Sequence, residues 1–88
     1  MITNDYIILA PQGIHARPAT MLIRLVKNFH SAVSLKSGDK TVRLNSMLNI
    51  LSLSIKGGET ITVIADGEDE VEAARAIGLF FTEQLKDL

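Results

Sequence analysis

Apolar and polar residues alternate in four stretches of this chain, which predicts four β-strands. Residues 2–8 form the first predicted strand and residues 60–65 the last. The two middle strands contain residues 33–35 and 42–44, and they flank Gly38-Asp39, a sequence suited to a tight turn. The middle pair is therefore predicted to be a β-hairpin with one buried face.

Apolar residues at helical spacing predict three helices. The first covers residues 16–28, and a short helix is favoured over a strand for residues 45–53. The last helix follows an acidic cluster at residues 68–72, where negative charge suits a helix start, and it extends to Leu85. The side chains expected to face the core are those of Ala19, Leu22, Ile23, Val26, Ile50, Leu53, Val71, Ala74, Ile77, Gly78, Phe81 and Leu85.

The order of these elements is strand-helix-strand-strand-helix-strand-helix. This order predicts an α+β fold in which the helices cover one face of a sheet. The 88 residues suffice for one small domain over residues 1–88, with a single core.

Composition narrows the range of functions. Nine basic and ten acidic residues give a net charge of -1, so there is no general electrostatic attraction for nucleic acid or an anionic membrane. The absence of cysteine excludes disulfides and thiolate metal sites. The first residues lack the basic start of a secretory signal, and no apolar run is long enough for membrane insertion. A cytoplasmic protein is therefore expected.

The segment Gly13–Thr20 carries the candidate chemistry, because it places a histidine where a loop becomes a helix. Pro18 is tolerated in a first helical turn, so the helix is expected to begin near Ala16. Backbone N–H groups at a helix start lack intrahelical acceptors, and the helix dipole adds positive charge, so an anion would be held beside His15. Arg17 suits phosphoryl oxygens, and a neutral imidazole can carry a phosphoryl group covalently. The alternative is a histidine that only caps the helix or faces solvent.

The run Gly13-Ile14-His15-Ala16-Arg17-Pro18-Ala19-Thr20 resembles the active-site segment of the HPr family, the histidine-containing phosphocarriers of the bacterial phosphotransferase system. The resemblance implies an open-faced β-sandwich of βαββαβα order, with a four-stranded antiparallel sheet and three helices on one face. It also implies that His15 accepts a phosphoryl group from enzyme I and passes it to enzyme IIA components for sugar uptake, with Arg17 assisting. Such a protein is a carrier without turnover of its own, and it needs no cofactor or metal. Because the phosphoryl group must leave again, the site of His15 is expected to be exposed.

Ser46 precedes the short apolar helix and is expected to be its N-cap. A phosphoryl group there would meet free N–H groups and a favourable dipole, so phosphorylation could act as a switch that adds about two negative charges. In many Gram-positive members of the HPr family, the equivalent serine is phosphorylated by an ATP-dependent HPr kinase/phosphorylase, and the product regulates carbon metabolism. The resemblance thus adds this kinase and a catabolite-control transcription factor as partners.

Three positions depart from the family pattern. Gln12 stands where a shorter Asn or Ser is usual, and Asn49 and Ser54 stand where glycine is common. The departure at position 12 concerns the orientation of the imidazole, and the other two concern the regulation of Ser46.

A helix as short as residues 45–53 cannot bury all its apolar side chains, so part of it is expected to face partner proteins. The predicted docking patch beside His15 consists of Met47, Leu48 and Leu51, with a polar rim of Thr20, Arg24 and Lys27. Two alternatives to the sugar relay are an HPr paralogue that serves nitrogen or transcriptional regulation, and a binding module that has lost phosphoryl transfer. A monomer is the expected oligomeric state.

Overall fold

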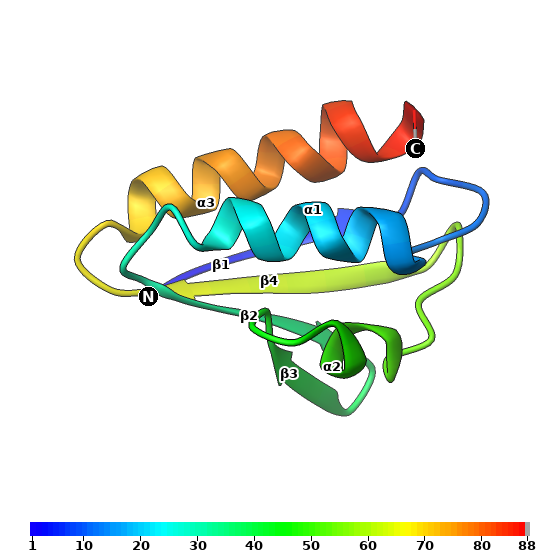
Figure 1. Ribbon diagram of the computed structural model, residues 1–88, viewed down its shortest axis with the longest axis horizontal. Coiled ribbons are helices and arrows are strands. Elements are labelled where there is room, and N and C mark those ends of the chain that lie inside the picture. Colours follow the sequence, from blue (N-terminus) through cyan, green and yellow to red (C-terminus); the bar gives the residue numbers. More distant parts are fainter. Residues whose placement is uncertain (88) are drawn as a thin grey trace.

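The computed structural model describes residues 1–87, and it has a four-stranded antiparallel sheet covered by three helices (Figure 1). In chain order the elements are β1 (Ile2–Ile7), α1 (Ala16–Val26), β2 (Ala32–Ser37), β3 (Lys40–Arg43), α2 (Met47–Leu51), β4 (Thr60–Asp66) and α3 (Glu70–Leu79). The chain then continues as a turn of π-helix, Phe80–Gln84, and a 3-10 turn, Leu85–Asp87. The predicted fold class and element order are confirmed.

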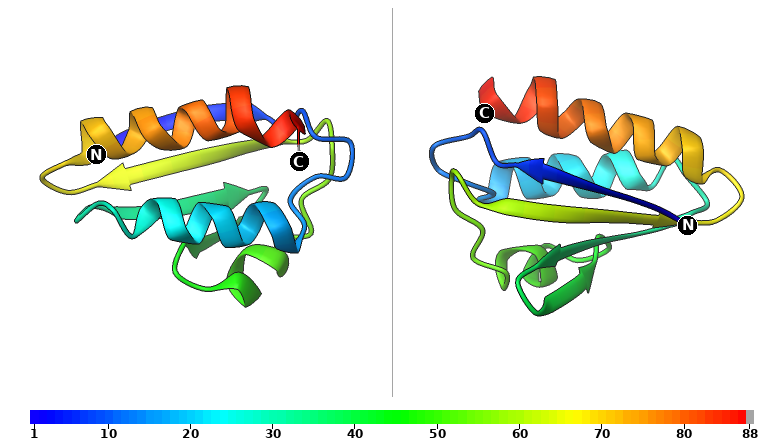
Figure 2. Two further views of the ribbon diagram at one scale, coloured as in Figure 1. Left: turned by 45° about the horizontal axis from the view of Figure 1, so that its top comes forward. Right: turned by 180° about the vertical axis from the view of Figure 1, so that it is seen from behind.

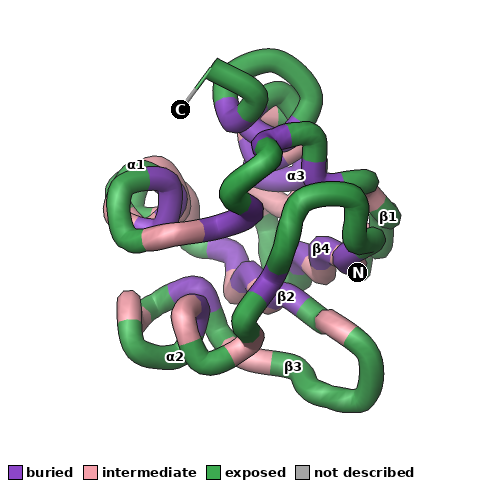
Figure 3. The backbone as a smooth tube through the Cα atoms, turned by 90° about the vertical axis from the view of Figure 1, so that its right-hand side faces the viewer, coloured by how far each residue is buried: buried purple, intermediate pink, exposed green. Residues whose placement is uncertain are grey.

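The strand order β1-β4-β2-β3 brings the first and last strands of the chain together in the sheet. Ile7 pairs with Thr60, so the loop that leaves β1 and the loop that enters β4 emerge at the same end of the sheet. Ser37 pairs with Lys40, which confirms the predicted turn at Gly38-Asp39. In the view of Figure 3, α1, α2 and α3 lie on one side of the sheet, and the other side is uncovered.

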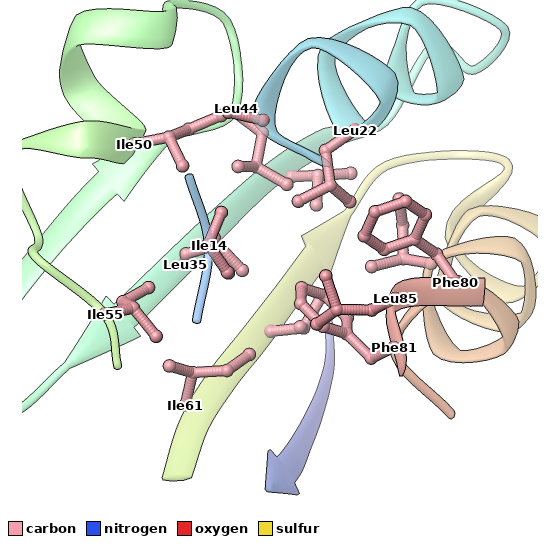
Figure 4. Close-up of a cluster of buried hydrophobic side chains, with 14 of the residues drawn as sticks. Ile14, Leu22, Leu35, Leu44, Ile50, Ile55, Ile61, Phe80, Phe81 and Leu85 are labelled. Atoms are coloured by element: carbon pink, nitrogen blue, oxygen red, sulfur yellow. The ribbon is translucent and has the colours of Figure 1, made fainter. Parts of the chain in front are cut away.

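The core lies between the inner face of the sheet and the helices. Leu35 on β2 and Val63 on β4 are opposite each other in the register, and both are buried. Figure 4 shows side chains from α1, α2 and the C-terminal turns, among them Leu22, Ile50 and Leu85, pointing into this layer. Burial of each such side chain stabilises the fold by about 1.5–3 kcal/mol.

The C-terminal helix packs differently from its predicted pattern. Val71 is 56% exposed and lies outside the core, whereas Ala73 and Phe80 are buried. After Leu79 the helix widens into a π turn, which lets the neighbouring residues Phe80 and Phe81 both face the core. The two rings make an edge-to-face pair with centroids 5.4 Å apart.

The boundaries of α1 and the burial of Leu53 also differ from prediction. The first helix ends at Val26, two residues before the predicted end at Asn28, and Lys27 is its C-cap. Leu53 follows α2 and is only partly buried against the core. Ends of helices are weakly determined by the apolar pattern, because capping and loop geometry decide them.

The carboxylate of Asp69 ties the start of α3 to the segment between α1 and β2. It accepts hydrogen bonds from the backbone N–H groups of His30 and Ser31, both at 2.8 Å, and from the Ser31 hydroxyl. These donors, the Ser31 hydroxyl first, lower the pKa of Asp69 below its ordinary value because they stabilise the ionised form. The acidic cluster before α3 thus has a structural role at this position.

Neither a membrane span nor a metal cluster occurs within residues 1–87. Every helix in this range is too short or too polar to cross a bilayer. No three histidine or carboxylate side chains in the same range gather closely enough to hold a metal ion.

Candidate functional site

His15 lies immediately before α1 and is the N-cap residue of that helix. Its backbone is extended, with φ -101° and ψ -170°, and its carbonyl accepts the first intrahelical hydrogen bond, from Ala19 N at 3.1 Å. The side chain makes no capping hydrogen bond. The imidazole is therefore placed at a helix start, as predicted, without being engaged by the helix.

The first turn of α1 leaves two backbone donors unpaired. The N–H groups of Ala16 and Arg17 have no acceptor among residues 1–87, and Pro18 has no N–H group. No acidic side chain lies in this turn. The partial positive charge of the helix start is therefore available to an anion beside His15.

Backbone contacts with the segment before β4 hold the loop that carries His15. Ile8 N donates to Glu59 O at 2.8 Å, and Ile14 N donates to Ile55 O at 3.2 Å. The two loops lie side by side at one end of the molecule in both Figure 1 and Figure 2. Ile14 and Ile55 are also both buried in the core, so the approach to His15 is fixed by apolar packing as well as by hydrogen bonds.

Glycine at position 13 makes this approach possible. Gly13 has a φ of +70°, and a Cβ atom there would lie 2.1 Å from the carbonyl oxygen of Ile55. Gly57, on the facing segment, has a similar constraint, because its Cβ would lie 2.6 Å from Ala10 O. Larger residues at these positions would force the two loops apart.

The imidazole of His15 is half-buried, although an exposed site is expected from the sequence. Nε2 is buried, and among residues 1–87 it is the one buried side-chain nitrogen or oxygen without a hydrogen-bond partner. The residues before the histidine, Gly13 and Ile14, are packed against the segment before β4, so His15 follows a buried stretch of chain, which the local sequence pattern does not reveal. The ring is therefore held by its surroundings on one side.

Arg17 is exposed and forms no ion pair or hydrogen bond within residues 1–87. Gln12 is also exposed and has no side-chain hydrogen bond within the same range. The guanidinium of Arg17 projects from the turn that offers the two free amides. It is therefore an exposed positive group near the histidine, unpaired within residues 1–87.

Ser46 is the N-cap of α2, as predicted. Its Oγ accepts a hydrogen bond from Asn49 N at 3.4 Å, and the side chain is half-buried. At the other end of this helix Ser54 has a φ of +51°, a conformation that favours glycine. The sequence departure at Ser54 therefore falls where the backbone has a positive φ.

The predicted docking patch is only partly exposed. Leu48 is 80% exposed, but Met47 and Leu51 are half-buried and pack against the core, so the expectation that all three are exposed is wrong. The reason is that one turn of helix between α1 and β3 turns most of its side chains inward. In the rim, Arg24 and Lys27 are exposed, and the Thr20 hydroxyl donates to Ala16 O at 2.9 Å.

The main chain at Lys56 and Gly57 also contacts the loop that carries His15, and no sequence pattern predicts this contact. Both belong to an irregular segment, and the glycine pair at 57–58 reads only as a break in the chain. No periodic pattern marks residues that meet a distant loop. Their position follows from the pairing of β1 with β4.

The sequence of this chain is similar to those of known proteins. Residues 2–83 match the family model described as "PTS HPr component phosphorylation site". The phosphocarrier protein HPr of Lysinibacillus sphaericus is 36% identical over 83 residues, which are 94% of each chain.

Two solved structures extend the comparison to the fold. HPr-C-His from Thermoanaerobacter tengcongensis has a TM-score of 0.91 and 28% identity, covering 100% of this chain and 98% of that one. The Bacillus subtilis catabolite repression containing protein Crh, described as a dimer with a swapping domain, has a TM-score of 0.77 and 30% identity, covering 97% and 98%.

We predict that Gly13→Ala destabilises the protein more than Gly38→Ala does. Gly38 also has a positive φ, +59°, but a Cβ there would meet nothing within 4 Å. Both variants incur the cost of a positive φ, about 1–2 kcal/mol, and Gly13→Ala adds roughly 1–3 kcal/mol from the displaced loop. Urea unfolding measures both free energies. Equal losses would mean that the loop contact is not a constraint.

Proposed function

Because the chain belongs to the HPr family of phosphotransferase-system phosphocarriers, we propose that His15 accepts a phosphoryl group from phosphorylated enzyme I and passes it to enzyme IIA components. The observation that carries this proposal is an imidazole at a helix start whose first two amides are unpaired within residues 1–87. A histidine that merely capped the helix would engage one of those amides, and its side chain does not.

The proposed step is an in-line displacement at phosphorus. A lone pair on a ring nitrogen of neutral His15 forms the new P–N bond while the bond from phosphorus to the donor breaks, and the donor atom keeps that electron pair. Because Nε2 is buried, the nucleophile is assigned to Nδ1, the nitrogen nearer the backbone. Nε2 then carries the ring proton throughout.

The oxygens of the transferred group would be bound by the N–H groups of Ala16 and Arg17 and by the Arg17 guanidinium. Backbone amides fixed in a helix start require no reorganisation when negative charge arrives. The guanidinium adds a planar, permanently charged fork that matches phosphoryl oxygens. Together they favour an in-line geometry for an incoming donor.

The unpaired Nε2 also bears on the release of the group. A phosphorylated imidazole with a proton on the second nitrogen carries positive charge in the ring, which a carboxylate at Nε2 would stabilise. No residue among 1–87 supplies such a partner. The phosphohistidine is thus stabilised only modestly, as a carrier requires if the group is to leave again.

We propose Ser46 as a regulatory phosphorylation site, with an HPr kinase/phosphorylase as the modifying enzyme and a catabolite-control transcription factor as a reader. Its Oγ lies at the start of α2, where the cap bond to Asn49 N is long, 3.4 Å. A phosphoryl group on Ser46 would accept hydrogen bonds from the backbone N–H groups at the start of α2 without unfolding the helix. It would also add negative charge next to the docking surface.

The surface proposed to bind enzyme I and enzyme IIA combines Leu48 with Arg24 and Lys27. Leu48 is a large exposed apolar side chain on α2, Arg24 is exposed on α1, and Lys27 is the exposed C-cap of α1, which contacts α2. An exposed apolar side chain with cations on the neighbouring helix suits acidic partner surfaces. Met47, Leu51 and Thr20 then support this surface more than they contact the partner.

A second candidate is a carrier whose relay serves regulation; Crh, which shares the fold, is described as a catabolite repression containing protein. Phosphoryl transfer through His15 is common to the sugar and regulatory relays, so only the acceptor proteins distinguish them. A binding module without phosphoryl transfer, by contrast, would not require His15.

We predict that enzyme I and phosphoenolpyruvate place one acid-labile, alkali-stable phosphoryl group on the protein, and that His15→Ala abolishes it. Arg17→Ala should slow acceptance about tenfold to hundredfold because it removes charge at the developing phosphoryl oxygens. It should change the free energy of unfolding by less than about 0.5 kcal/mol. Mass spectrometry and rapid-quench labelling measure these effects.

The control for Arg17→Ala is Arg43→Ala, an exposed cation on β3 opposite Ser34 of β2. Arg43→Ala should transfer like the native protein. If the native chain stays unmodified while a reference carrier reacts, the carrier proposal is wrong. If Arg43→Ala is slowed as much as Arg17→Ala, the loss reflects overall charge.

A separate prediction concerns Ser46→Asp, which should retain the fold and accept the phosphoryl group about tenfold more slowly. The added charge repels acidic groups of enzyme I at the docking surface. Thr41→Asp, an exposed position on β3, matches the change in charge and should react normally. Unchanged kinetics for Ser46→Asp would leave Ser46 as a helix cap only.

A further inference from the structure

Lys56 lies on the segment that supports the His15 loop, outside the motif of residues 13–20. A Cβ atom on Gly13 would lie 2.7 Å from Lys56 Cα, so the two main chains are in contact at this point. The backbone N–H of Ile14 donates a hydrogen bond to the carbonyl of Ile55, the residue before Lys56, at 3.2 Å. The position of Lys56 beside the loop is therefore fixed by backbone contacts.

The side chain of Lys56 is long enough to reach the site. One residue, Ile14, separates His15 from Gly13, so their Cα atoms are at most about 7 Å apart. A lysine side chain extends through five single bonds of about 1.5 Å each and is flexible. Its ammonium can therefore reach the space around the imidazole from the facing loop.

Lys56 is also free to bind an anion. The residue is exposed and forms no salt bridge within residues 1–87. The carboxylate of Glu59 is occupied locally, because its Oε1 accepts from the backbone N–H of Lys56 at 2.6 Å. That hydrogen bond fixes the turn of residues 56–59 through the backbone of Lys56, and it leaves the Lys56 ammonium available to an anion.

We propose that the Lys56 ammonium contacts the phosphoryl group carried on His15, as a second cation beside Arg17. Arg17 projects from α1, and Lys56 comes from the segment before β4, so the two charges approach from different elements. This inference rests on the proposed function, and it assigns a further phosphoryl-binding residue to the same site. It adds no bond-breaking step, since the ammonium stabilises charge only.

The test is a 31P NMR titration of the phosphorylated protein. A nearby ammonium favours the dianionic phosphoryl group, so Lys56→Gln should raise the pKa of that group by about half a pH unit. Lys56→Arg keeps the charge and should behave like the native protein. Lys36→Gln removes an exposed cation from β2, paired with Thr62 in the register, and should leave the pKa unchanged.

Added salt and the unfolding midpoint complete the design. The difference between Lys56→Gln and the native protein should shrink in 1 M salt, where charges are screened within about 3 Å. The unfolding midpoint of Lys56→Gln should match that of the native protein, which shows that the turn is intact. An identical phosphoryl pKa in both proteins, or the same rise in Lys36→Gln, would overturn the assignment.

The outcomes separate this inference from the proposed function. If the native protein accepts no phosphoryl group, both the proposed function and the role of Lys56 are wrong. A native protein that is phosphorylated on His15, together with an unaltered titration for Lys56→Gln, would remove the role of Lys56 alone.

Discussion

The contact between two main-chain segments, residues 10–14 and residues 55–57, is the constraint on which the site depends. The carbonyl of Ile55 occupies the place where any side chain at position 13 would begin, so only glycine lets the loop lie this close. The hydrogen bond from Ile14 N to that carbonyl then fixes the chain one residue before His15. The position at which the imidazole leaves the main chain is thereby set by backbone geometry, and no side-chain partner within residues 1–87 orients the ring through Nε2.

The sheet topology produces this contact. Because β1 pairs with β4, the loop after one strand and the loop before the other meet at the same end of the sheet. The core strengthens the contact between the two loops, since Ile14 and Ile55 are buried in the same cluster as Leu22 of α1. Apolar packing and backbone hydrogen bonds together thus position the histidine at the helix start. The arrangement leaves the amides of Ala16 and Arg17 open to an external anion.

Local signals predicted the parts of the fold and site that depend on local chemistry. Pro18 marked the start of α1, Gly38-Asp39 marked the hairpin turn, and Ser46 marked the start of α2, because capping and turn preferences act over a few residues. The HPr resemblance supplied the fold of the sheet, which periodicity alone does not give. It was confirmed by the match of residues 2–83.

Features that depend on tertiary packing were either not predicted from the sequence or predicted wrongly. Lys56 lies beside the His15 loop only because two distant loops meet, and no local pattern marks the burial of Nε2. Met47 and Leu51 turn inward because α2 is a single turn between other elements.

The central claim, that the first amides of α1 bind the transferred group, is tested most directly by 15N-1H NMR before and after phosphorylation. The amide protons of Ala16 and Arg17 should move downfield more than those of α2, and unchanged resonances for both would contradict the account.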